Sequence, residues 1–307
     1  MILFFTKGDF LMKVIVLSSK SYQSESNYGD CILLDTGKSL VIYDCGSTTH
    51  ANRVLDYMIK HNYSSAQFIL SHNDRDHFAG LPTLLQENKI SAIYTTLLLQ
   101  YVDQILDRID DHRKTRESVK KQILNIYDNI AKLSGQPIYD IYNHKSQINL
   151  PSGIEIIGPS IEYMLDTVAK RLDGRESNTQ DSETAINATS IQVKVSIDST
   201  TTLLLCGDSS FASLENLIYD YDYIQLPHHG TADSAKKIFE KNDAATSIDS
   251  IRKIYLISDN TGNSNGGSDK LDIQGHQVKN TKFGDILIPE PNNTNFNLLP
   301  VTGCLGE

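Results

Sequence analysis

The sequence predicts one α/β domain in which two β-layers are flanked by helices. Three observations predict this fold class. A chain of 307 residues with 39% apolar and 21% charged content can bury a large core, as ordinary globular proteins do. Strand-like and helix-like segments follow one another in both halves. Residues 97–134 are helical in character and stand apart as an insert, so we expect a domain of residues 1–307 with that insert and an N-terminal extension at 1–11.

The first part of the chain reads mainly as strands and turns. Apolar and β-branched runs predict the strands, and the turn at 35–38 predicts a hairpin between two of them. Val54, Leu55 and Met58 recur at helical spacing and predict a helix at 52–60. The predicted strands are 13–17, 31–34, 39–43, 68–70 and 92–95, and a short helix is predicted at 81–87.

The insert at 97–134 contains neither Gly nor Pro, and its apolar residues recur at helical spacing. It predicts two helices with a break near 112–115. The polar segment 173–187 predicts a loop. Downstream, strands are predicted at 191–197, 201–206, 222–226 and 253–258, and helices at 212–218, 234–241 and 268–276.

The net charge of −10 bears on the choice of partners. Proteins that bind long duplexes normally present a basic face, and this chain has no basic excess. A local basic cluster lies in the insert, at Arg108, Arg113, Lys114, Arg116, Lys120 and Lys121. Acidic residues interleave with it, so one interpretation is a solvated helix face. The other is a surface that meets a phosphate chain or a partner protein.

Cysteine usage and hydropathy predict a cytoplasmic protein without membrane association. The cysteines Cys31, Cys45, Cys206 and Cys304 show no short paired spacing, which argues against a zinc ribbon or a disulfide framework. Three of them lie in or beside apolar runs and are expected to be small buried hydrophobes. No run approaches the roughly 18 apolar residues that a membrane helix needs. The apolar stretch 1–5 is too short for a signal-peptide core.

The segment 71–81, SHNDRDHFAGL, is the most informative part of the chain. It places His72, Asp74, Asp76 and His77 directly after a predicted strand. Carboxylates and imidazoles this close repel or desolvate one another unless a positive charge lies among them. A pair of divalent metal ions is the economical explanation, because imidazole nitrogen and carboxylate oxygen are the ligands of hydrolytic Zn, Mn or Fe sites.

Two further clusters follow predicted strands. Asp208 follows one strand, and His228 and His229 follow another. Loops at the ends of buried strands present reactive groups from a rigid scaffold. Taken alone, Asp208 is a candidate cap for a helix that begins near Ser210, and the two histidines are a candidate half-buried structural pair. Taken together with the segment 71–81, the clusters predict one metal site.

These motifs resemble those of the metallo-β-lactamase-fold hydrolases. The segment 71–81 looks like their His-x-His/Asp-x-Asp-His signature, and 203–208 looks like the strand that carries their metal-bridging Asp. The chain is most similar to the hydrolase domain of bacterial DNA-uptake (competence) channel proteins, and its histidine pair also resembles that of phosphorylcholine esterases. The resemblance implies a four-layer αββα sandwich with a helical insert. The segments that carry it are 28–34, 41–46, 71–81, 187–190, 203–208 and 226–231.

The resemblance also implies metal ligands. Asp76 and His77 would bind one metal, His72 and Asp74 would bind the other, and Asp208 would bridge both. His229 would complete the shell. The full implied set is His72, Asp74, Asp76, His77, Asp208, His228 and His229.

Catalytic roles follow from the same resemblance. Asp76 would accept a proton as well as bind metal. His228 would be either a second ligand or a donor to the oxygen of the scissile group, and sequence alone leaves both roles open. Asp44 would orient the loop that carries the ligands.

Two departures from the family pattern affect the metal. Many members have His where Asp74 stands, and a further His where Asn187 or Ser190 stands. More carboxylates and fewer imidazoles make a harder site, which shifts its preference from Zn toward Mn or Mg, or weakens one position. The late strand motif of the family often ends with another His, whereas here no histidine follows the predicted strand 253–258 until His276. We therefore expect two divalent ions, Zn or Mn, with both positions or only one filled.

The predicted function is metal-dependent hydrolysis by a metal-activated water. We expect a phosphodiesterase or nuclease that acts on single-stranded nucleic acid or nucleotides, because a hard site suits phosphoryl oxygen and the acidic chain disfavours duplexes. In that interpretation the insert caps the site. One alternative is hydrolysis of a small ester, thioester or lactone. Another is a metal-poor binding or scaffold module whose helices at 97–134 contact a partner.

Overall fold

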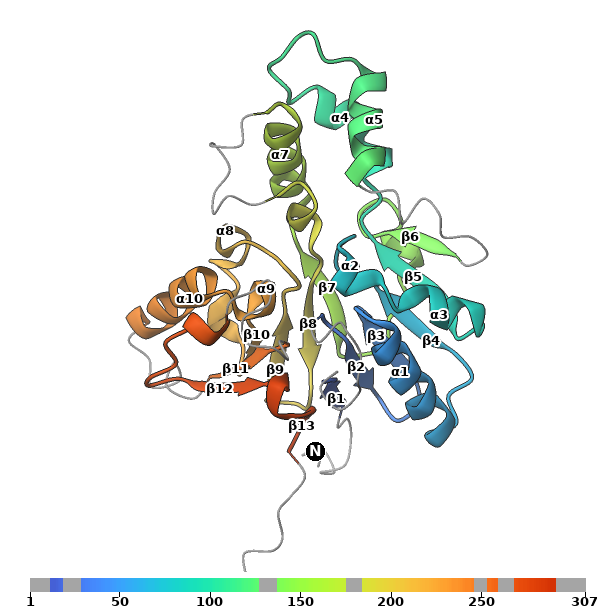
Figure 1. The fold of residues 1–307 in the computed structure, drawn as a ribbon, viewed down its shortest axis with the longest axis vertical. Coiled ribbons are helices and arrows are strands. Elements are labelled where there is room, and N and C mark those ends of the chain that lie inside the picture. The colour runs from blue at the N-terminus through green and yellow to red at the C-terminus, as the bar shows by residue number, and fades with distance from the viewer. Residues whose placement is uncertain are drawn as a thin grey trace, which may run out of the picture.

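Two mixed β-sheets face each other, and helices cover their outer faces (Figure 1). The computed structural model describes residues 12–18, 29–126, 137–174, 184–245, 253–258 and 268–290. The αββα layering that it shows is the predicted fold class. Several predicted features lie outside the described residues: the extension 1–11, Tyr28, residues 127–134 of the insert, and Cys304.

The first sheet has seven strands in the order β13-β1-β2-β3-β4-β5-β6. Strands β1, β2 and β3 are antiparallel, and β3 to β6 run parallel. The bounds are β1 Lys13–Val16, β2 Ile32–Asp35, β3 Leu40–Tyr43, β4 Ala66–Ile69, β5 Ile90–Thr95, β6 Ile138–Asp140 and β13 Ile286–Ile288.

The second sheet has six strands in the order β12-β11-β10-β9-β8-β7. Strands β7, β8 and β9 are antiparallel, and β9 to β12 run parallel. The bounds are β7 Ile154–Gly158, β8 Gln192–Ser196, β9 Thr202–Leu205, β10 Tyr223–Gln225, β11 Ile254–Ile257 and β12 Gln277–Asn280. Each half of the molecule thus joins an antiparallel hairpin to parallel strands.

Helices fill the outer layers. The α-helices are α1 Thr48–Lys60, α2 Arg75–Phe78, α3 Leu81–Gln86, α4 Val102–Leu106, α5 Arg116–Ile126, α7 Ile161–Leu172, α8 Phe211–Leu214, α9 Pro227–Gly230 and α10 Ala232–Ala244. Short 3-10 turns are η1 Leu98–Tyr101, η2 Lys145–Gln147, η5 Asn187–Thr189, η6 Ile218–Asp220, η8 Ser268–Lys270 and η9 Thr281–Phe283. None of the described helices is long and apolar enough to cross a bilayer.

Strand side chains point to two different cores, which explains why the strands read as continuous apolar runs. Val14 and Val16 of β1 pack between the two sheets, whereas Ile15 packs against the helices. A third core lies between the second sheet and α10, where Ile224 meets Phe239. The three apolar cores account for four layers.

The described part of the insert packs as helices next to α7. Helices α4 and α5 contact each other, and α4 contacts α7, at one end of the molecule (Figure 1). The break between α4 and α5 includes the predicted positions 112–115. The apolar spacing determines which face of α5 packs against the core, since Val119 and Ile123 of α5 are fully buried.

Some predicted elements are wrong or missing. Residues 268–276 form one 3-10 turn, η8, and then turns rather than a helix. At 212–218 only α8 and the start of η6 are helical. The elements β6, β7, α7, β12 and β13 were not predicted.

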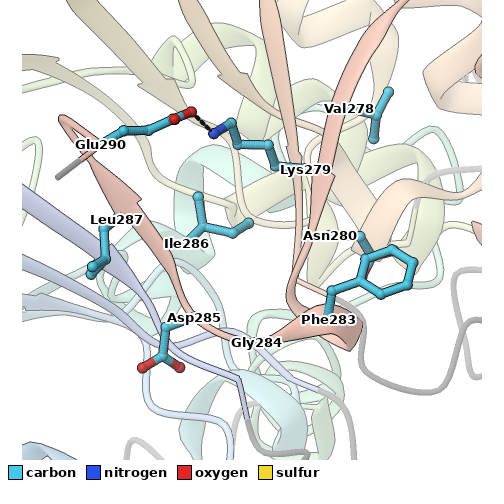
Figure 2. Close-up of a pocket in the computed structure, with 9 residues that line it drawn as sticks. All are labelled: Val278, Lys279, Asn280, Phe283, Gly284, Asp285, Ile286, Leu287 and Glu290. Atoms are coloured by element: carbon cyan, nitrogen blue, oxygen red, sulfur yellow. Dashed lines mark hydrogen bonds and ion pairs between the residues drawn. The ribbon is translucent and has the colours of Figure 1, made fainter. Parts of the chain in front are cut away.

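Strands β12 and β13 link the two sheets through η9, and a cavity of about 460 Å³ opens between them (Figure 2). Lys279 of β12 forms an ion pair with Glu290, and Phe283 is largely exposed at the turn (Figure 2). The residues that line this cavity include none of the predicted metal ligands.

Candidate metal centre

Three strand ends bring the predicted ligands together. The segment 71–77 follows β4, Asp208 follows β9, and the histidine pair follows β10. The two sheets therefore each contribute donors. Gly207 permits the approach, because a Cβ built on it would lie 2.9 Å from the Cβ of Ser71, and its φ of 52° suits glycine.

Asp208 lies at the centre of the cluster and is 6% exposed. Its Oδ1 is 3.2 Å from His77 Nε2, and its Oδ2 is 3.2 Å from His228 Nδ1. His72 Nε2 lies 3.8 Å from the same Oδ2. Asp208 thus faces three imidazoles from two separate loops. It does not cap α8, whose N-cap residue is Ser210 and which has no side-chain cap.

The remaining predicted ligands lie on either side of this centre. Asp74 Oδ2 is 3.6 Å from His72 Nε2, on the side where the Asp74 side chain is 40% exposed. Asp76 Oδ2 is 3.0 Å from His229 Nε2, on the buried side. The structure brings all the residues of the predicted set into this cluster: His72, Asp74, Asp76, His77, Asp208, His228 and His229.

The donor atoms at the centre fit a divalent metal. His72 Nε2, His77 Nε2 and Asp208 Oδ1 are all buried, and none has an aligned hydrogen-bond partner. Donor atoms of these three residues lie within 4.8 Å of one another. Unpartnered buried polar atoms are costly in a folded protein. Nitrogen and oxygen donors at this spacing are the atoms that a divalent metal ion would bind.

Asp44 orients His77 from behind. Its Oδ2 is 2.8 Å from His77 Nδ1, which leaves Nε2 directed at Asp208. Ser71 donates to Asp44 from its backbone N, at 2.7 Å, and from its hydroxyl, at 2.6 Å. Burial raises the pKa of the Asp44 carboxyl, and the nearby His77 opposes that shift. A carboxylate behind a ligating imidazole is the usual arrangement around a metal.

Mutual contact shifts the protonation of the central groups. Burial would lower the pKa of His77, but the carboxylates of Asp208 and Asp44 raise it well above its usual range. Burial would raise the pKa of Asp208 and of Asp76, but neighbouring imidazoles, including His228 at Asp208 and His229 at Asp76, lower both. The lowered pKa values of Asp208 and Asp76 favour the ionised carboxylates beside these imidazoles.

His228 lies at the exposed rim, with 29% of its side chain accessible. Its Nε2 is 3.3 Å from Asn187 Nδ2, and Asn187 Oδ1 is buried without a partner. Burial would lower the pKa of His228, but the Asp208 carboxylate raises it. Asn187 thus brings the segment 187–190 into the site through a contact with His228.

Asp30 belongs to the site, although sequence reasoning left it out of the ligand set. It is 1% exposed, and its Oδ1 lies 3.2 Å from His229 Nδ1. Gln225 and Ser258 both donate hydrogen bonds to its carboxylate. The available signal was its place in the segment 28–34, directly before a buried strand.

The loop at 71–77 is also tied to the helical insert. Asn73 Nδ2 donates to the backbone oxygen of Ile126, the last residue of α5, at 3.0 Å. Asn73 lies between the predicted ligands His72 and Asp74, so the position of α5 bears directly on the loop.

The basic residues of the insert are largely paired. Arg108 contacts Glu162 and Asp166 on α7, and Lys114 donates to the Leu172 backbone oxygen. Arg113 and Arg116 contact Asp111 and Asp103 respectively. These contacts favour an internally paired surface over a free phosphate-binding surface, although Arg108, Arg113 and Lys114 lie in the break between α4 and α5 and not on a helix face.

No protein-family profile matches the sequence, and no curated protein matches it either. Among solved structures, the metallo-β-lactamase fold protein YhfI from Bacillus subtilis is 13% identical, with 91% of this chain and 99% of that chain covered and a TM-score of 0.48. A diphosphatase of the PhnP family is 13% identical over 87% of this chain and 94% of its own, with a TM-score of 0.41. The short form of human tRNase Z is 14% identical over 91% and 100%, with a TM-score of 0.38.

Proposed function

We propose that this chain is a metal-dependent hydrolase. The observation that carries the proposal is the convergence of His72, His77 and Asp208, whose buried donor atoms face one another without aligned partners. Packing alone does not account for such an arrangement, because each unpartnered group costs stability unless a ligand satisfies it.

We propose that the site holds two ions, as the resemblance implies. His72, Asp74 and Asp208 would hold one, and Asp76, His77 and His229 the other, with Asp208 shared. Divalent ions held there would supply Lewis acidity and an activated water. The lowered pKa of Asp76 keeps this carboxylate ionised, which suits a ligand better than a strong general base.

His228 is our candidate for the group that meets the substrate. It is partly exposed and close to Asp208, which raises its pKa. A protonated imidazole at the rim would donate a proton to the leaving oxygen or a hydrogen bond to the developing oxyanion. Asn187 would fix the ring, because its amide lies 3.3 Å from the outer nitrogen.

We propose a phosphodiester of nucleotide or short single-stranded size as the substrate. The donor set contains Asp74 beside His72, and carboxylate oxygens favour hard ions such as Mn, which suit phosphoryl oxygen. The net charge of −10 and the paired arginines of the insert disfavour a long duplex. The resemblance of the sequence to the competence-protein hydrolase domain also points toward a nucleic-acid or nucleotide substrate.

The insert 97–134 is proposed to form a cap within a single domain. Asn73 of the ligand loop contacts the end of α5, which supports this placement. The same helices are the proposed contact surface for any partner protein. We propose the cytoplasm as the compartment, because the described cysteines, Cys31, Cys45 and Cys206, are buried free thiols.

A substrate panel with metal add-back tests the proposal. Chelated protein is reconstituted with Zn or Mn and assayed on single-stranded DNA, RNA, cyclic nucleotides, a phosphodiester dye and a lactone. We expect turnover of a phosphodiester, and we expect Asp76→Ala and His77→Ala each to abolish it, because each removes a donor from the centre. Turnover of the lactone alone would select the small-ester alternative.

Two further outcomes would contradict the proposal. Retained turnover in both variants would remove Asp76 and His77 from the mechanism. A purified wild type that binds less than about half an equivalent of metal and hydrolyses nothing after add-back would favour the binding-module alternative, since hydrolysis at such a site depends on the ion.

A further inference from the structure

We propose that Asp30 is a positioning residue that holds His229 in the orientation required to bind metal. This inference rests on the proposed metal-dependent function and adds a residue to it. The backbone of residues 29–30 lies directly against helix α2, which carries the proposed ligands Asp76 and His77. The Asp30 backbone N donates to the Asp76 backbone oxygen at 3.0 Å, and the Gly46 backbone N donates to the Asp30 backbone oxygen at 2.8 Å.

Glycines make that approach possible. A Cβ built on Gly46 would lie 1.8 Å from the Asp76 backbone oxygen, and one on Gly29 would lie 2.5 Å from it. Real Cβ atoms do not approach backbone oxygens this closely, so only glycine fits at either position. The segment that carries Asp30 is therefore held in place independently of its side chain.

The side chain of Asp30 faces the rear of two imidazoles. Its Oδ1 is 3.2 Å from His229 Nδ1, and its Oδ2 is 3.9 Å from His77 Nδ1. The opposite nitrogens of these rings face other carboxylates: His229 Nε2 faces Asp76, and His77 Nε2 faces Asp208. A ligating imidazole presents one nitrogen to the metal and donates the other N–H to a carboxylate. Asp30 lies on the second side.

Among the described residues, Asp30 is placed to be the partner of His229 Nδ1. This nitrogen is buried and has no aligned hydrogen bond, with the Asp30 oxygen 3.2 Å away. His77 differs, because its Nδ1 lies 2.8 Å from Asp44. Asp30 would thus orient the His229 ring by accepting from its Nδ1–H, as Asp44 orients the ring of His77.

Asp30 is itself held by the second sheet. Gln225 of β10 donates one hydrogen bond to it, and Ser258, which follows β11, donates another. The Gln225 oxygen accepts from Cys206 N at 3.0 Å, directly before the Asp208 turn. This hydrogen-bond network therefore positions His229 relative to Asp208, and it connects both residues to Asp30, which precedes β2 of the first sheet.

The alternative assignment is that Asp30 is itself a ligand, since Asp30, His77 and His229 form a second cluster with metal-binding geometry. Two observations favour positioning. The Asp30 carboxylate already accepts hydrogen bonds from Gln225 and Ser258. It also faces Nδ1 atoms, one of which Asp44 already contacts.

The test compares Asp30→Asn with Asp35→Asn, using Zn²⁺ alone as the probe. Both aspartates are buried near the ends of β2, but Asp35 contacts tyrosine hydroxyls and no predicted ligand. Zn²⁺ affinity and stoichiometry are measured by competition with a chromophoric chelator. We expect Asp30→Asn to weaken one of the two Zn²⁺ sites by about 10- to 100-fold, the range for a partner of a ligating imidazole, with both equivalents still bound at saturation.

Asp35→Asn is expected to bind both ions as the wild type does. Ser258→Ala, which removes one donor to Asp30, should weaken the same site by less and guards against a poorly folded Asp30 variant. Unchanged affinity in both Asp30→Asn and Ser258→Ala would overturn the inference. Loss of a whole equivalent at saturating Zn²⁺ in Asp30→Asn would also overturn it, and would make Asp30 a ligand.

A second readout does not require bound metal. In proton NMR spectra of the metal-free protein, we expect a downfield Nδ1–H resonance of His229, protected from exchange by Asp30. It should disappear in Asp30→Asn and persist in Asp35→Asn. Its absence from the wild type would contradict the inference even if turnover and Zn²⁺ binding support the proposed function. If the wild type binds no Zn²⁺ but shows this resonance, the proposed metal-dependent function is refuted, whereas the contact between Asp30 and His229 is supported.

Discussion

Two buried aspartates near the ends of one strand show how partners decide a residue's role. Asp35 closes β2 and accepts hydrogen bonds from Tyr57, Tyr63 and the Gly37 backbone N. Asp30, two residues before β2, faces imidazoles that belong to the candidate metal centre. The partners of Asp35 stabilise its carboxylate, whereas the partners of Asp30 connect its carboxylate to the proposed metal ligands.

Asp35→Asn tests the structural role at the residue scale. Burial would raise the pKa of Asp35, but the hydrogen bonds from Tyr57, Tyr63 and Gly37 lower it. Hydrogen bonds to a charged group contribute about 1.5–3 kcal/mol, so we expect the variant to lose about that much unfolding free energy at pH 7. Urea unfolding of both proteins measures the difference.

The pH dependence of that difference follows from the direction of the shift. A lowered native pKa stabilises the protein above the unfolded value of about 3.9 and stops doing so as the pH falls through the native value. The gap between the wild type and Asp35→Asn should therefore be full at pH 6 and shrink in acid. A gap that stays constant to pH 3 would mean that lost packing, and not the charge of Asp35, is responsible.

Among the short elements, α9 carries an unusual backbone. His228 and His229 have φ values of 53° and 54°, and Gly230 follows with 79°. Residues with a Cβ adopt this left-handed region at a cost of roughly 1–2 kcal/mol each. Strain of this kind persists where the surroundings enforce it, and here it directs His228 and His229 at two different carboxylates, Asp208 and Asp76.

Replacing His228 by Gly and by Ala separates backbone strain from side-chain chemistry. Both variants lose the imidazole, so both should lose most turnover if His228 meets the substrate. Glycine adopts φ 53° without strain, whereas alanine does not. The unfolding free energy of His228→Gly, measured by urea unfolding, should therefore exceed that of His228→Ala by about 1 kcal/mol. Equal stability would show that the loop relaxes once the histidine is removed.

The contact between the ligand loop and the insert is a second feature at this scale. Asn73 donates its side-chain N–H to the backbone oxygen of Ile126, the last described residue of α5. We expect Asn73→Ala to lose about 1 kcal/mol of unfolding free energy, the typical value of one hydrogen bond. We also expect Zn²⁺ affinity to fall by about tenfold, because the loop between His72 and Asp74 is less restrained.

Ser160→Ala is the control for this prediction. Ser160 caps α7 by accepting from the Tyr163 backbone N at 3.2 Å, so its loss should cost about 1 kcal/mol. It lies in the same group of helices but outside the ligand loop, so Zn²⁺ affinity should not change. Equal loss of affinity in both variants would mean that Asn73 acts only through general stability.

At the scale of the whole molecule, the sequence predicts what is local and misses what depends on distant pairing. The ligands of 71–77 lie within one short segment, and their chemistry is visible without coordinates. Asp30 gains its role only because His229, Gln225 and Ser258 fold next to it. No pattern within 28–34 records those partners.

The missed elements differ in how much local signal they carry. Strand β12 reads Gln-Val-Lys-Asn and lies at a sheet edge, so it lacks the apolar run that marks the central strands. Helix α7 had local signals, with Ser160 as its N-cap and Met164, Leu165 and Val168 at core spacing. By contrast, the predicted helix at 268–276 fails where Asp272 accepts from the Gln274 backbone N and Gly275 turns with φ 86°.

Donors from both sheets meet in one centre, so metal binding should stabilise the whole molecule. His72 and His77 belong to the first sheet's loops, whereas Asp208 and His229 belong to the second's. A ligand that binds only the folded state adds about 2.7 kcal/mol per site at a concentration of 100 times its Kd. We therefore expect saturating Zn²⁺ to raise the unfolding free energy by several kcal/mol, measured by urea unfolding with and without a chelator.

Asp35→Asn should gain the same increment as the wild type, since it leaves the centre intact, while Asp208→Ala should gain much less. The metal-free forms of both proteins must fold for this comparison, and the apolar core between the two sheets, which does not include Asp208, provides for that. An increment that survives in Asp208→Ala would place the bound ion elsewhere. Because the centre joins the two sheets, its loss would leave them held by their apolar core and by direct hydrogen bonds such as the one from the Tyr43 hydroxyl to the Ile191 backbone oxygen.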